Sequence, residues 1–373
     1  MGPRLLVMGA GTGASNNLIR SLRAGHDEFF IVGCHPDRFT IRKSSADRNY
    51  VVPDSNHPDL YRALCDIIEA EEIDLLIPNS DTDVQVIVPL QDALPCRTFL
   101  PRPPIVDLCQ DKYELTNLLR AHNVPAPQTY PISDLSTIED LFGRLAPHSR
   151  LWCRIRTGNS SAGALPVETV EQARGWIQYW NDMRGVTADL FTLSEYLPGR
   201  DFNLQCLLHE GIPVLLKMCE RLSYFVTGNS PSGVSSTPAV ARTVEDRRVI
   251  AICLRAFRAI DERASGVFNV DLKENVEGVP CITEINAGRF AMITNIYDLT
   301  GRHNMAITYV HLALGNKVDI QTADDIAEDY YLVRDLDTTP GIFHADQLFD
   351  GIHDGRRPPI PLEQQDNRLV KET

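Results

Sequence analysis

The sequence has none of the cysteine or histidine patterns that mark metal sites or disulfide frameworks. Its 373 residues include nine cysteines, an odd number, and ten histidines. No two cysteines are spaced Cys-x-x-Cys and no two histidines His-x-x-x-His, and most cysteines lie in apolar runs, as Cys153 and Cys253 do. We therefore expect reduced core cysteines in a cytoplasmic protein, and no metal site built on nitrogen or sulfur.

Positive charge and long hydrophobic runs are also scarce. The chain has 36 basic and 50 acidic residues and a formal net charge of −14, which argues against a protein that binds nucleic acid by neutralising phosphates. No stretch approaches the roughly 20 apolar residues of a membrane-spanning helix. The apolar run at residues 5–8 is too short for a secretion signal. We expect neither nucleic acid nor membrane as a partner.

The first hundred residues alternate strand and helix patterns. Apolar runs at residues 4–8, 29–33 and 74–78 have the length of buried strands, and segments with helical spacing of apolar residues separate and follow them. This alternation predicts a parallel sheet with helices on both faces. Prolines 101, 103 and 104 then indicate a boundary, so residues 1–103 are expected to form the first domain.

The remaining chain mixes helices and strands without strict alternation. We expect a small lobe at 104–188, a larger lobe at 189–325 and a C-terminal extension at 326–373, with a loose tail after about residue 355. The expected helices are at 105–122 (one helix or a pair), 169–184, 243–261 and 304–314. The expected strands are at 128–130, 151–155, 190–195, 202–208, 213–218, 267–272 and 280–285, and a polar loop covers 221–238.

A glycine-rich turn follows the first strand. Gly9-Ala-Gly11-Thr-Gly13-Ala14 fits the pattern G-x-G-x-x-G/A, in which backbone N–H groups approach a dinucleotide at a helix N-terminus. Asp37 is the one acid placed to bind a ribose. The pattern alone is weak, and a tight strand–helix turn that binds no dinucleotide is the favoured interpretation.

The most informative segments are Asn269-Val-Asp271 and Ile282-Thr-Glu284-Ile-Asn286. In each expected strand the polar residues alternate with apolar ones, so Asp271, Glu284 and Asn286 project from one kind of face. Two carboxylates and an amide oxygen form an all-oxygen site of the type that suits Mg²⁺. The alternative is a set of solvated strand acids.

Several cations and one small-residue loop fit a phosphate site. Arg154 and Arg156 run into the loop at 157–163, which can donate backbone N–H groups to phosphate. Lys217 lies in an apolar strand and needs a charged partner, which a phosphate would supply. Asp201, after the turn at 195–200, could accept hydrogen bonds from a ribose. The alternatives are a surface Arg154, a snorkelling Lys217 and a simple turn acid.

Taken together and in this order, residues 4–315 resemble the ATP-grasp superfamily, and most of all one synthetase module of the carbamoyl phosphate synthetase large subunit. The most specific pieces are Gly266-Val-Phe-Asn-Val-Asp271 and Ile282-Thr-Glu-Ile-Asn286. The resemblance implies an α/β chain with a Rossmann-like N-terminal domain that binds no NAD, followed by a two-lobed α+β ATP-grasp fold. Only one module is present, which excludes a complete carbamoyl phosphate synthetase.

The resemblance also implies roles for individual residues in binding ATP and Mg²⁺, with Mn²⁺ as a substitute. Asp271, Glu284 and Asn286 would hold the metal. The implied nucleotide ligands are Lys112 and Arg154 for phosphate, Ser160, Ser161 and Gly163 in the phosphate loop, Glu195, Tyr196 and Leu197 at the adenine, Asp201 at the ribose, and Lys217 at phosphate.

Two departures from the family pattern stand out. Most ATP-grasp enzymes have lysine and proline where this chain has Arg154 and Ile155, although arginine also occurs in the carbamoyl phosphate synthetase branch. The family usually continues Asn-Pro-Arg after the last metal ligand, whereas this chain has Asn286-Ala-Gly-Arg289. Arg289 is nevertheless expected to face the transferred phosphoryl group.

The activity implied is that of an ATP-dependent carboxylate–amine ligase with small-molecule substrates, and a homodimer is compatible with the likeness. Arg154, Lys217 and Arg289 are the expected catalytic cations, Arg289 and Arg221 the candidate carboxylate clamps, and the loop at 223–237 the candidate lid. Three alternatives stay open. They are a nucleotide-binding protein without turnover, a kinase-like or carboxyphosphate-forming variant, and an NAD(P)-dependent oxidoreductase that uses the glycine turn.

Overall fold

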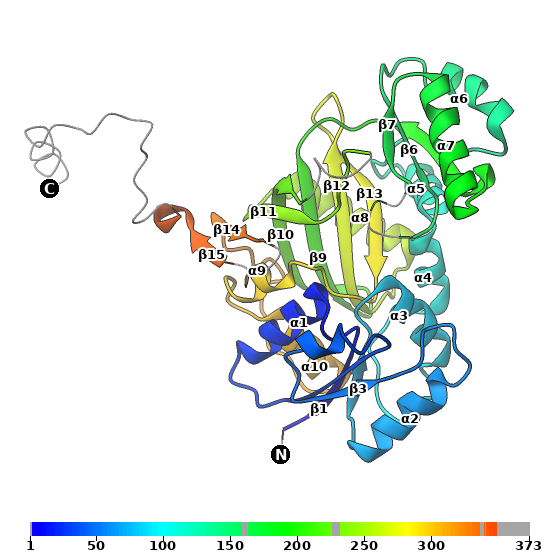
Figure 1. The fold of residues 1–373 in the computed structure, drawn as a ribbon. Coiled ribbons are helices and arrows are strands. Elements are labelled where there is room, and N and C mark those ends of the chain that lie inside the picture. Colours follow the sequence, from blue (N-terminus) through cyan, green and yellow to red (C-terminus); the bar gives the residue numbers. More distant parts are fainter. Residues whose placement is uncertain are drawn as a thin grey trace, which may run out of the picture.

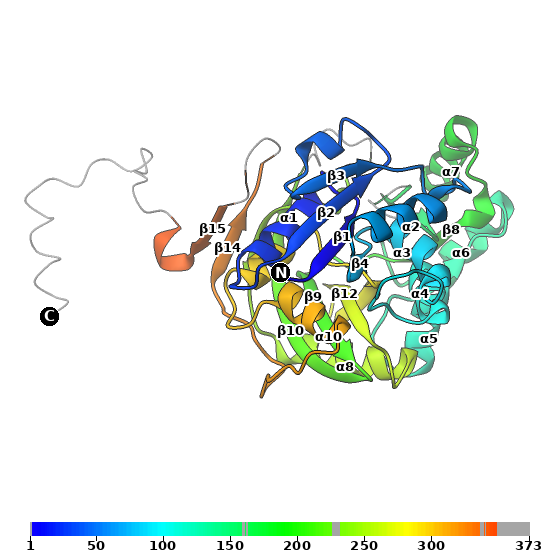
Figure 2. The ribbon, with the colours of Figure 1, turned by 90° about the horizontal axis from the view of Figure 1, so that it is seen from below.

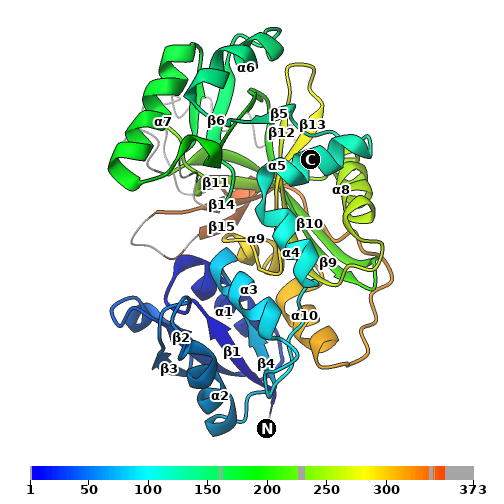
Figure 3. The same ribbon diagram turned by 90° about the vertical axis from the view of Figure 1, so that its right-hand side faces the viewer.

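The computed structural model describes residues 2–158, 161, 163–225, 232–335, 339 and 341–348. Figure 1 shows an N-terminal α/β domain, a large central sheet, and a small lobe built around α6 and α7. Figure 3 shows the same three parts in sequence along the molecule, with the central sheet between the other two. No helix in the described ranges is long and apolar enough to cross a membrane.

The N-terminal domain contains the predicted parallel sheet, in the order β3-β2-β1-β4. Its strands are Arg48–Val51 (β3), Phe30–His35 (β2), Arg4–Met8 (β1) and Leu75–Ile77 (β4), and all three pairings are parallel. The edge strand β3 was not predicted, because its residues are mostly exposed and polar.

Helices cover both faces of this sheet, which confirms the prediction (Figure 2). Side chains of β1 alternate between two cores. Leu6 and Met8 pack with α2 (Leu60–Ala70) and α3 (Asp81–Ile87), whereas Leu5 and Val7 pack with α1 (Gly13–Arg23) and α10 (Met305–Ala313). A short helix η2 (Val88–Leu90) continues α3. The helix α10, almost 300 residues after α1 begins, therefore helps to cover the N-terminal sheet.

The small lobe is an antiparallel sheet in the order β5-β8-β6-β7, covered by two helices. Its strands are Thr129–Pro131 (β5), Phe191–Glu195 (β8), Leu151–Ile155 (β6) and Leu165–Val167 (β7), and its helices Ile138–Arg144 (α6) and Val170–Arg184 (α7). A capping box between Thr169 and Gln172 begins α7, and Gly185 ends it with a positive φ of 65°.

In the part of the chain that the structure describes, the central sheet has seven antiparallel strands, in the order β13-β12-β9-β10-β11-β14-β15. One face packs on the helix pair α4 (Pro103–Gln110) and α5 (Lys112–Ala121) and on α8 (Arg247–Ile260). The short α9 (Thr294–Asp298) lies near α1. The strands are Asp201–His209 (β9), Ile212–Tyr224 (β10), Pro238–Thr243 (β11), Gly266–Glu274 (β12), Pro280–Ala287 (β13), Tyr330–Val333 (β14) and Gly341–His344 (β15).

Four of these strands differ from the expectation from sequence. β10 continues to Tyr224 into the segment expected to be a loop, and β11 follows the loop rather than a helix start at residue 243. β14 and β15 lie in the segment expected to be a C-terminal extension. The tail after about residue 355 lies outside the described residues, and the domain boundaries stay a prediction.

A buried carboxylate joins three elements of the N-terminal domain and gives a stability prediction. Glu71, 2% exposed, accepts hydrogen bonds from Arg4 at 2.8 Å, from Arg48 at 2.6 Å and from the hydroxyl of Tyr50. We expect Glu71→Ala to lower the free energy of unfolding by about 2 kcal/mol, because it leaves these donors unpaired. Urea unfolding followed by circular dichroism measures the loss. Glu69→Ala, at an exposed position in the last turn of the helix that Glu71 follows, should leave stability unchanged. Equal stability of both variants would contradict the assignment.

Candidate functional site

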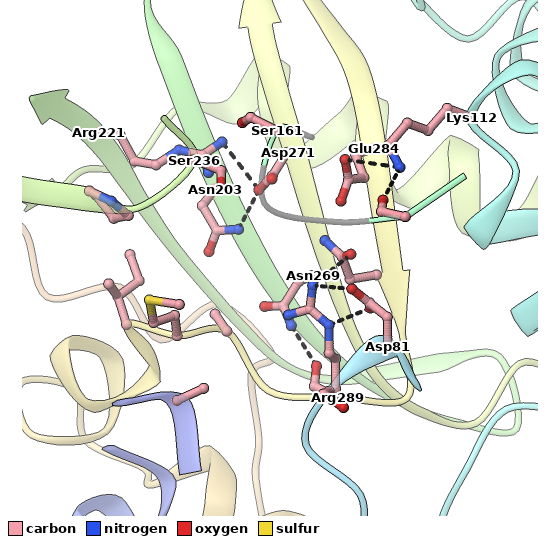
Figure 4. A pocket seen from close by; sticks show the side chains of 18 of the residues that line it. Asp81, Lys112, Ser161, Asn203, Arg221, Ser236, Asn269, Asp271, Glu284 and Arg289 are labelled. Carbon is pink, nitrogen blue, oxygen red and sulfur yellow. Dashed lines mark hydrogen bonds and ion pairs between the residues drawn. The ribbon is translucent and has the colours of Figure 1, made fainter. Parts of the chain in front are cut away.

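The predicted metal ligands lie on two neighbouring strands, β12 and β13, and Figure 4 shows Asp271 and Glu284 among them. In the register of β12 and β13, Asp271 is opposite Glu284, and Asn269 is opposite Asn286. Side chains two residues apart on a strand share a face, and residues opposite one another on antiparallel strands are in contact range. The sheet register therefore brings Asp271, Glu284 and Asn286 to one surface, as the alternation of polar and apolar residues predicted.

That surface forms one wall of a cleft made of three adjoining pockets. The central pocket, of about 410 Å³, is lined from all three parts of the protein: by the strand residues above, by Arg154 and Trp152 of β6, and by the segment that follows β4. Two further pockets adjoin the central one, and Glu284 lines all three. The pocket toward the small lobe has a volume of about 320 Å³, and the pocket beside α4 one of about 440 Å³. The predicted site is thus a cleft and not a solvated strand surface.

Two buried cations face the carboxylates across the cleft. Lys112, 7% exposed, places Nζ 3.8 Å from Glu284 Oε2 and donates a hydrogen bond to the carbonyl of Gly158. Arg154, 8% exposed, donates from Nη2 to the carbonyl of Thr283 at 3.0 Å. Its Nε is buried and has no hydrogen-bond partner among the described residues. Arg156, in contrast, is bound to Asp111 at 2.7 Å, at the start of α5.

The electrostatics of Lys112 and Arg154 show the cost of burying them. Burial lowers the pKa of both groups, and the nearby Glu284 opposes this only in part. Arg154 also lowers the pKa of Lys112 by repulsion between the two charges. An anion placed between them would relieve the repulsion and would give Arg154 Nε an acceptor.

The expected adenine and ribose ligands line the pocket toward the small lobe. Glu195, Tyr196 and Leu197 lie there with Asp201. The backbone N–H of Gln128 donates to Glu195 Oε2 at 3.1 Å. The ring of Tyr196 lies 6.1 Å from that of Trp152. This pocket thus combines aromatic surface with polar groups, as an adenine nucleoside requires.

Of the residues expected in the phosphate loop, one lines the cleft, one packs against the small-lobe sheet and one lies outside the described residues. Ser161 lines the central pocket, whereas Ser160 lies outside the described residues. Gly163 packs against β6, because a Cβ on it would lie 2.5 Å from Ile155 Cγ1, and its carbonyl accepts a hydrogen bond from Trp176 Nε1 at 2.9 Å. Of the candidate lid, Ser236 lines the cleft, and residues 226–231 lie outside the described residues.

Lys217 corrects the prediction that it contacts nucleotide phosphate. Its side chain is 1% exposed, and Nζ lies 2.5 Å from Asp325 Oδ2. It is not among the described residues that line the three pockets. The sequence argument that a buried lysine needs an anion was sound, but the anion is a carboxylate 108 residues further along the chain. We therefore remove Lys217 from the candidate catalytic and phosphate ligands.

Arg289 lines the cleft and is held by the N-terminal domain. Its Nε lies 2.5 Å from Asp81 Oδ1, and its Nη2 donates to Asp81 Oδ2 at 3.0 Å and to Asn286 Oδ1 at 2.8 Å (Figure 4). Burial lowers the pKa of Arg289, but Asp81 outweighs this and keeps it raised. The guanidinium therefore stays charged beside the candidate metal ligand Asn286.

Sequence reasoning missed the contribution of the N-terminal domain to this wall. Asn79, Ser80 and Asp81 follow β4 and line the central pocket. Polar residues directly after a strand of a parallel sheet are a known signal for a ligand site, and this signal could have found them. It also missed Asn203 of β9, whose Nδ2 donates to Asp271 Oδ1 at 2.8 Å. The hydroxyl of Tyr297 donates to Asn203 Oδ1 at 2.6 Å and so fixes the orientation of the amide.

The glycine turn supports the interpretation as a tight strand–helix connection. Gly11 has a φ of 89°, and a Cβ on it would lie 2.0 Å from the carbonyl oxygen of Thr40. Asp37, the candidate ribose ligand of a dinucleotide, instead accepts the backbone N–H groups of Phe39 and Thr40, both at 2.7 Å. Thr12, which caps α1, lines the central pocket. The turn therefore forms part of the cleft wall.

The donor set fits a hard cation that brings ligands of its own. Within the described ranges there is no group of three or more His, Cys, Asp or Glu side chains that could hold a metal by themselves. Asp271 and Glu284 supply two carboxylates and Asn286 one amide oxygen. Mg²⁺ is typically bound by one or two carboxylates, with waters and substrate phosphates completing its shell.

The pairing of Lys217 with Asp325 predicts that Lys217 stabilises the fold and does not bind nucleotide. Burial raises the pKa of Asp325, but hydrogen bonds from Lys217 and from the backbone of His303 outweigh it and lower the pKa to about 2. We expect Lys217→Met to cost about 3 kcal/mol of stability, because it removes the buried partner of Asp325 and leaves that carboxylate with only the exposed Arg302 and two backbone N–H groups. The double variant Lys217→Met/Asp325→Asn should recover part of this. Urea unfolding tests both.

The same pair predicts a pH dependence. Because the folded-state pKa of Asp325 lies below its ordinary value of 3.8, its stabilising effect is present above about pH 4 and is lost as the pH falls toward 2. The difference in stability between the wild type and the double variant should shrink over that range. If Lys217→Met were as stable as the wild type but bound nucleotide more weakly, the assignment of Lys217 to the core would be wrong.

Comparison with known proteins finds similarity of structure only. No protein-family model and no curated protein matches the sequence. Among solved structures, an L-amino acid ligase from Bacillus licheniformis has a TM-score of 0.67 at 12% identity, over 88% of this chain and 78% of that one. A biotin carboxylase from Campylobacter jejuni has a TM-score of 0.68 at 12% identity, over 89% of this chain and 75% of that one.

A third similar structure is N5-carboxyaminoimidazole ribonucleotide synthetase from Thermotoga maritima, with a TM-score of 0.59 at 15% identity over 89% of this chain and 80% of that one. At these identities the likeness concerns the fold. It agrees with the motifs quoted from the sequence and with the arrangement of an N-terminal α/β domain and two further lobes. The chain has the fold of the ATP-grasp enzymes.

Proposed function

We propose that this chain is an ATP-dependent ligase that activates a substrate carboxylate and couples it to an amine. The observation that carries the proposal is Arg154, a buried guanidinium whose Nε has no partner among the described residues and which faces Asp271 and Glu284 across a cleft. A buried donor without an acceptor is costly, so an anionic ligand is the natural occupant.

The charge of the central pocket supports an anionic ligand. Its described lining contains three carboxylates and four cations, although the whole chain has a net charge of −14. The carboxylates are Asp81, Asp271 and Glu284, and the cations are Lys112, Arg154, Arg221 and Arg289. A triphosphate with a bound divalent metal matches both the negative and the positive side chains, because the carboxylates bind the metal and the cations bind phosphate.

The residues of the cleft divide between the parts of the nucleotide. Asp271, Glu284 and Asn286 would hold Mg²⁺, or Mn²⁺ in its place, and the metal would offset the phosphate charge when bound. Lys112, Arg154 and Ser161 would bind phosphate. The pocket toward the small lobe would take the nucleoside, with Glu195, Tyr196 and Leu197 beside the adenine and Asp201 at the ribose.

The chemistry proposed needs no covalent protein nucleophile. A substrate carboxylate oxygen attacks the γ-phosphorus, the bond to the β,γ-bridging oxygen breaks, and an acyl phosphate and ADP result. An amine then attacks the acyl carbon, phosphate leaves, and the nitrogen loses a proton. Arg154 and Lys112 position the phosphoryl group, and Arg289 stabilises charge beside it. The enclosing walls limit hydrolysis of the acyl phosphate by water.

The names of the similar structures support a ligase while leaving the substrates open. They include an L-amino acid ligase, a biotin carboxylase and a carboxyaminoimidazole ribonucleotide synthetase. A carboxyphosphate-forming reaction is therefore the second candidate. An NAD(P)-dependent oxidoreductase is disfavoured, because Asp37 is bound within its own turn. A homodimer and a cytoplasmic location stay predictions.

The direct test is an ADP-release screen over amino acids and small carboxylates, including bicarbonate, with hydroxylamine as the trapping nucleophile. Formation of a hydroxamate reports the acyl phosphate. We expect Asp271→Asn and Glu284→Gln each to lower turnover at least about 1000-fold, because both remove charge that the metal needs. Glu277→Gln, in the exposed turn between the same two strands, is the matched control. Near-normal turnover in either cleft variant would show that the metal assignment is wrong.

A further inference from the structure

Arg221 lies between two acids of the cleft because of the sheet register. On β10 it is opposite Asp201 of β9, and two residues further along β9, Asn203 is opposite Asp271 of β12. Asp201 and Asn203 share a face of their strand. The register thus places the arginine, the expected ribose acid and the expected metal acid in one diagonal row across three strands, on the side that forms the cleft.

The guanidinium of Arg221 binds both acids at once. Its Nη2 lies 3.2 Å from Asp271 Oδ1, as Figure 4 shows. Its Nε donates to Asp201 Oδ1 at 2.8 Å. The side chain is 10% exposed, and the two carboxylates are 17% and 21% exposed. The hydroxyl of Tyr224 also donates to Asp201. This arrangement differs from the carboxylate clamp expected from the sequence, because the guanidinium is already engaged by the protein's own acids.

We propose that Arg221 is the resident counter-cation of the metal site, which keeps free divalent metal out until nucleotide brings it in. The proposal rests on the proposed function. With Arg221 in place, Asp271 is neutralised and the described lining of the central pocket carries one more cation than carboxylates. A lone divalent cation would add like charge at short range, whereas a metal bound to polyphosphate adds net negative charge.

The position of Arg221 also assigns it a part in nucleotide binding. When a metal replaces Arg221 as the counter-ion of Asp271, Arg221 still binds Asp201, the acid expected at the ribose. The Arg221 side chain therefore couples metal binding at Asp271 to the position of Asp201. The neighbouring amide of Asn203, fixed by Tyr297, keeps Asp271 oriented while its counter-ion changes.

The test measures Mn²⁺ binding in the absence of nucleotide, from the loss of the free-ion signal in electron paramagnetic resonance. We expect wild type to bind Mn²⁺ weakly and Arg221→Met to bind it at least about tenfold more tightly at neutral pH, because the repelling charge is gone. Arg221→Lys, which keeps the charge, should resemble wild type. Adding Asp271→Asn to Arg221→Met should abolish the gain and so locate the metal.

The matched control is Arg242→Met, since Arg242 is an arginine of the same sheet that pairs with Glu220 at 3.0 Å outside the described cleft lining. It should leave Mn²⁺ affinity unchanged. Equal affinity of wild type and a folded Arg221→Met, checked by circular dichroism, would overturn the proposal. So would a gain of equal size in Arg242→Met.

A second measurement needs only the wild type, should Arg221→Met fail to fold. Mn²⁺ affinity is compared with and without a non-hydrolysable ATP analogue, and the proposal requires weak binding alone and much tighter binding with the analogue. Tight Mn²⁺ binding without nucleotide would overturn it. If the analogue does not bind at all, with or without metal, the proposed function fails instead, so the two failures are distinguishable.

Discussion

The site depends on the pairing of carboxylates with cations across one face of the central sheet. Each acid that matters in the cleft has a cation from another element close to it: Glu284 has Lys112, Asp271 has Arg221, and Asp81 has Arg289. These charges can be half-buried because they are paired. The same strands carry apolar residues on their other face, packed under α4, α5 and α8. The alternation along β12 and β13 thus builds the core and the site together.

The pairing also joins the three parts of the protein into one cleft. Lys112 begins α5, Arg154 belongs to the small lobe, and Asp81 belongs to the N-terminal domain. Arg289, just after β13, connects Asp81 to the metal wall. A ligand in this cleft would touch all three parts. Its binding free energy would therefore also hold the lobes together, in a cleft that must exclude water.

Much of this arrangement could be predicted from the sequence, because it follows from the pattern of polar and apolar residues within short segments. The alternation in Asn269-Val-Asp271 and Thr283-Glu-Ile-Asn286 placed the acids on one face, and the strand–helix alternation predicted the parallel sheet. The helices at 169–184 and 304–314 were found within a few residues. These features need only neighbours in the chain to determine them, which is why one sequence was sufficient.

What the sequence could not provide depends on contacts between distant segments. The partner of Lys217 is 108 residues away and that of Arg289 is 208 residues away, so no local spacing reveals either pair. Lys217 was for this reason assigned to a ligand instead of to Asp325. The edge strands β3 and β15, and β14 beside β15, were missed because short strands with few buried residues lack a strong apolar pattern. The engagement of Arg221 required the register of three strands.

The most direct test of the account is a crystal structure grown with Mg²⁺ and a non-hydrolysable ATP analogue. The account predicts polyphosphate between Lys112 and Arg154, the metal on Asp271 and Glu284, and the adenine beside Tyr196 and Leu197. Nucleotide bound elsewhere, or a cleft in which Arg154 Nε meets no phosphate oxygen, would contradict it.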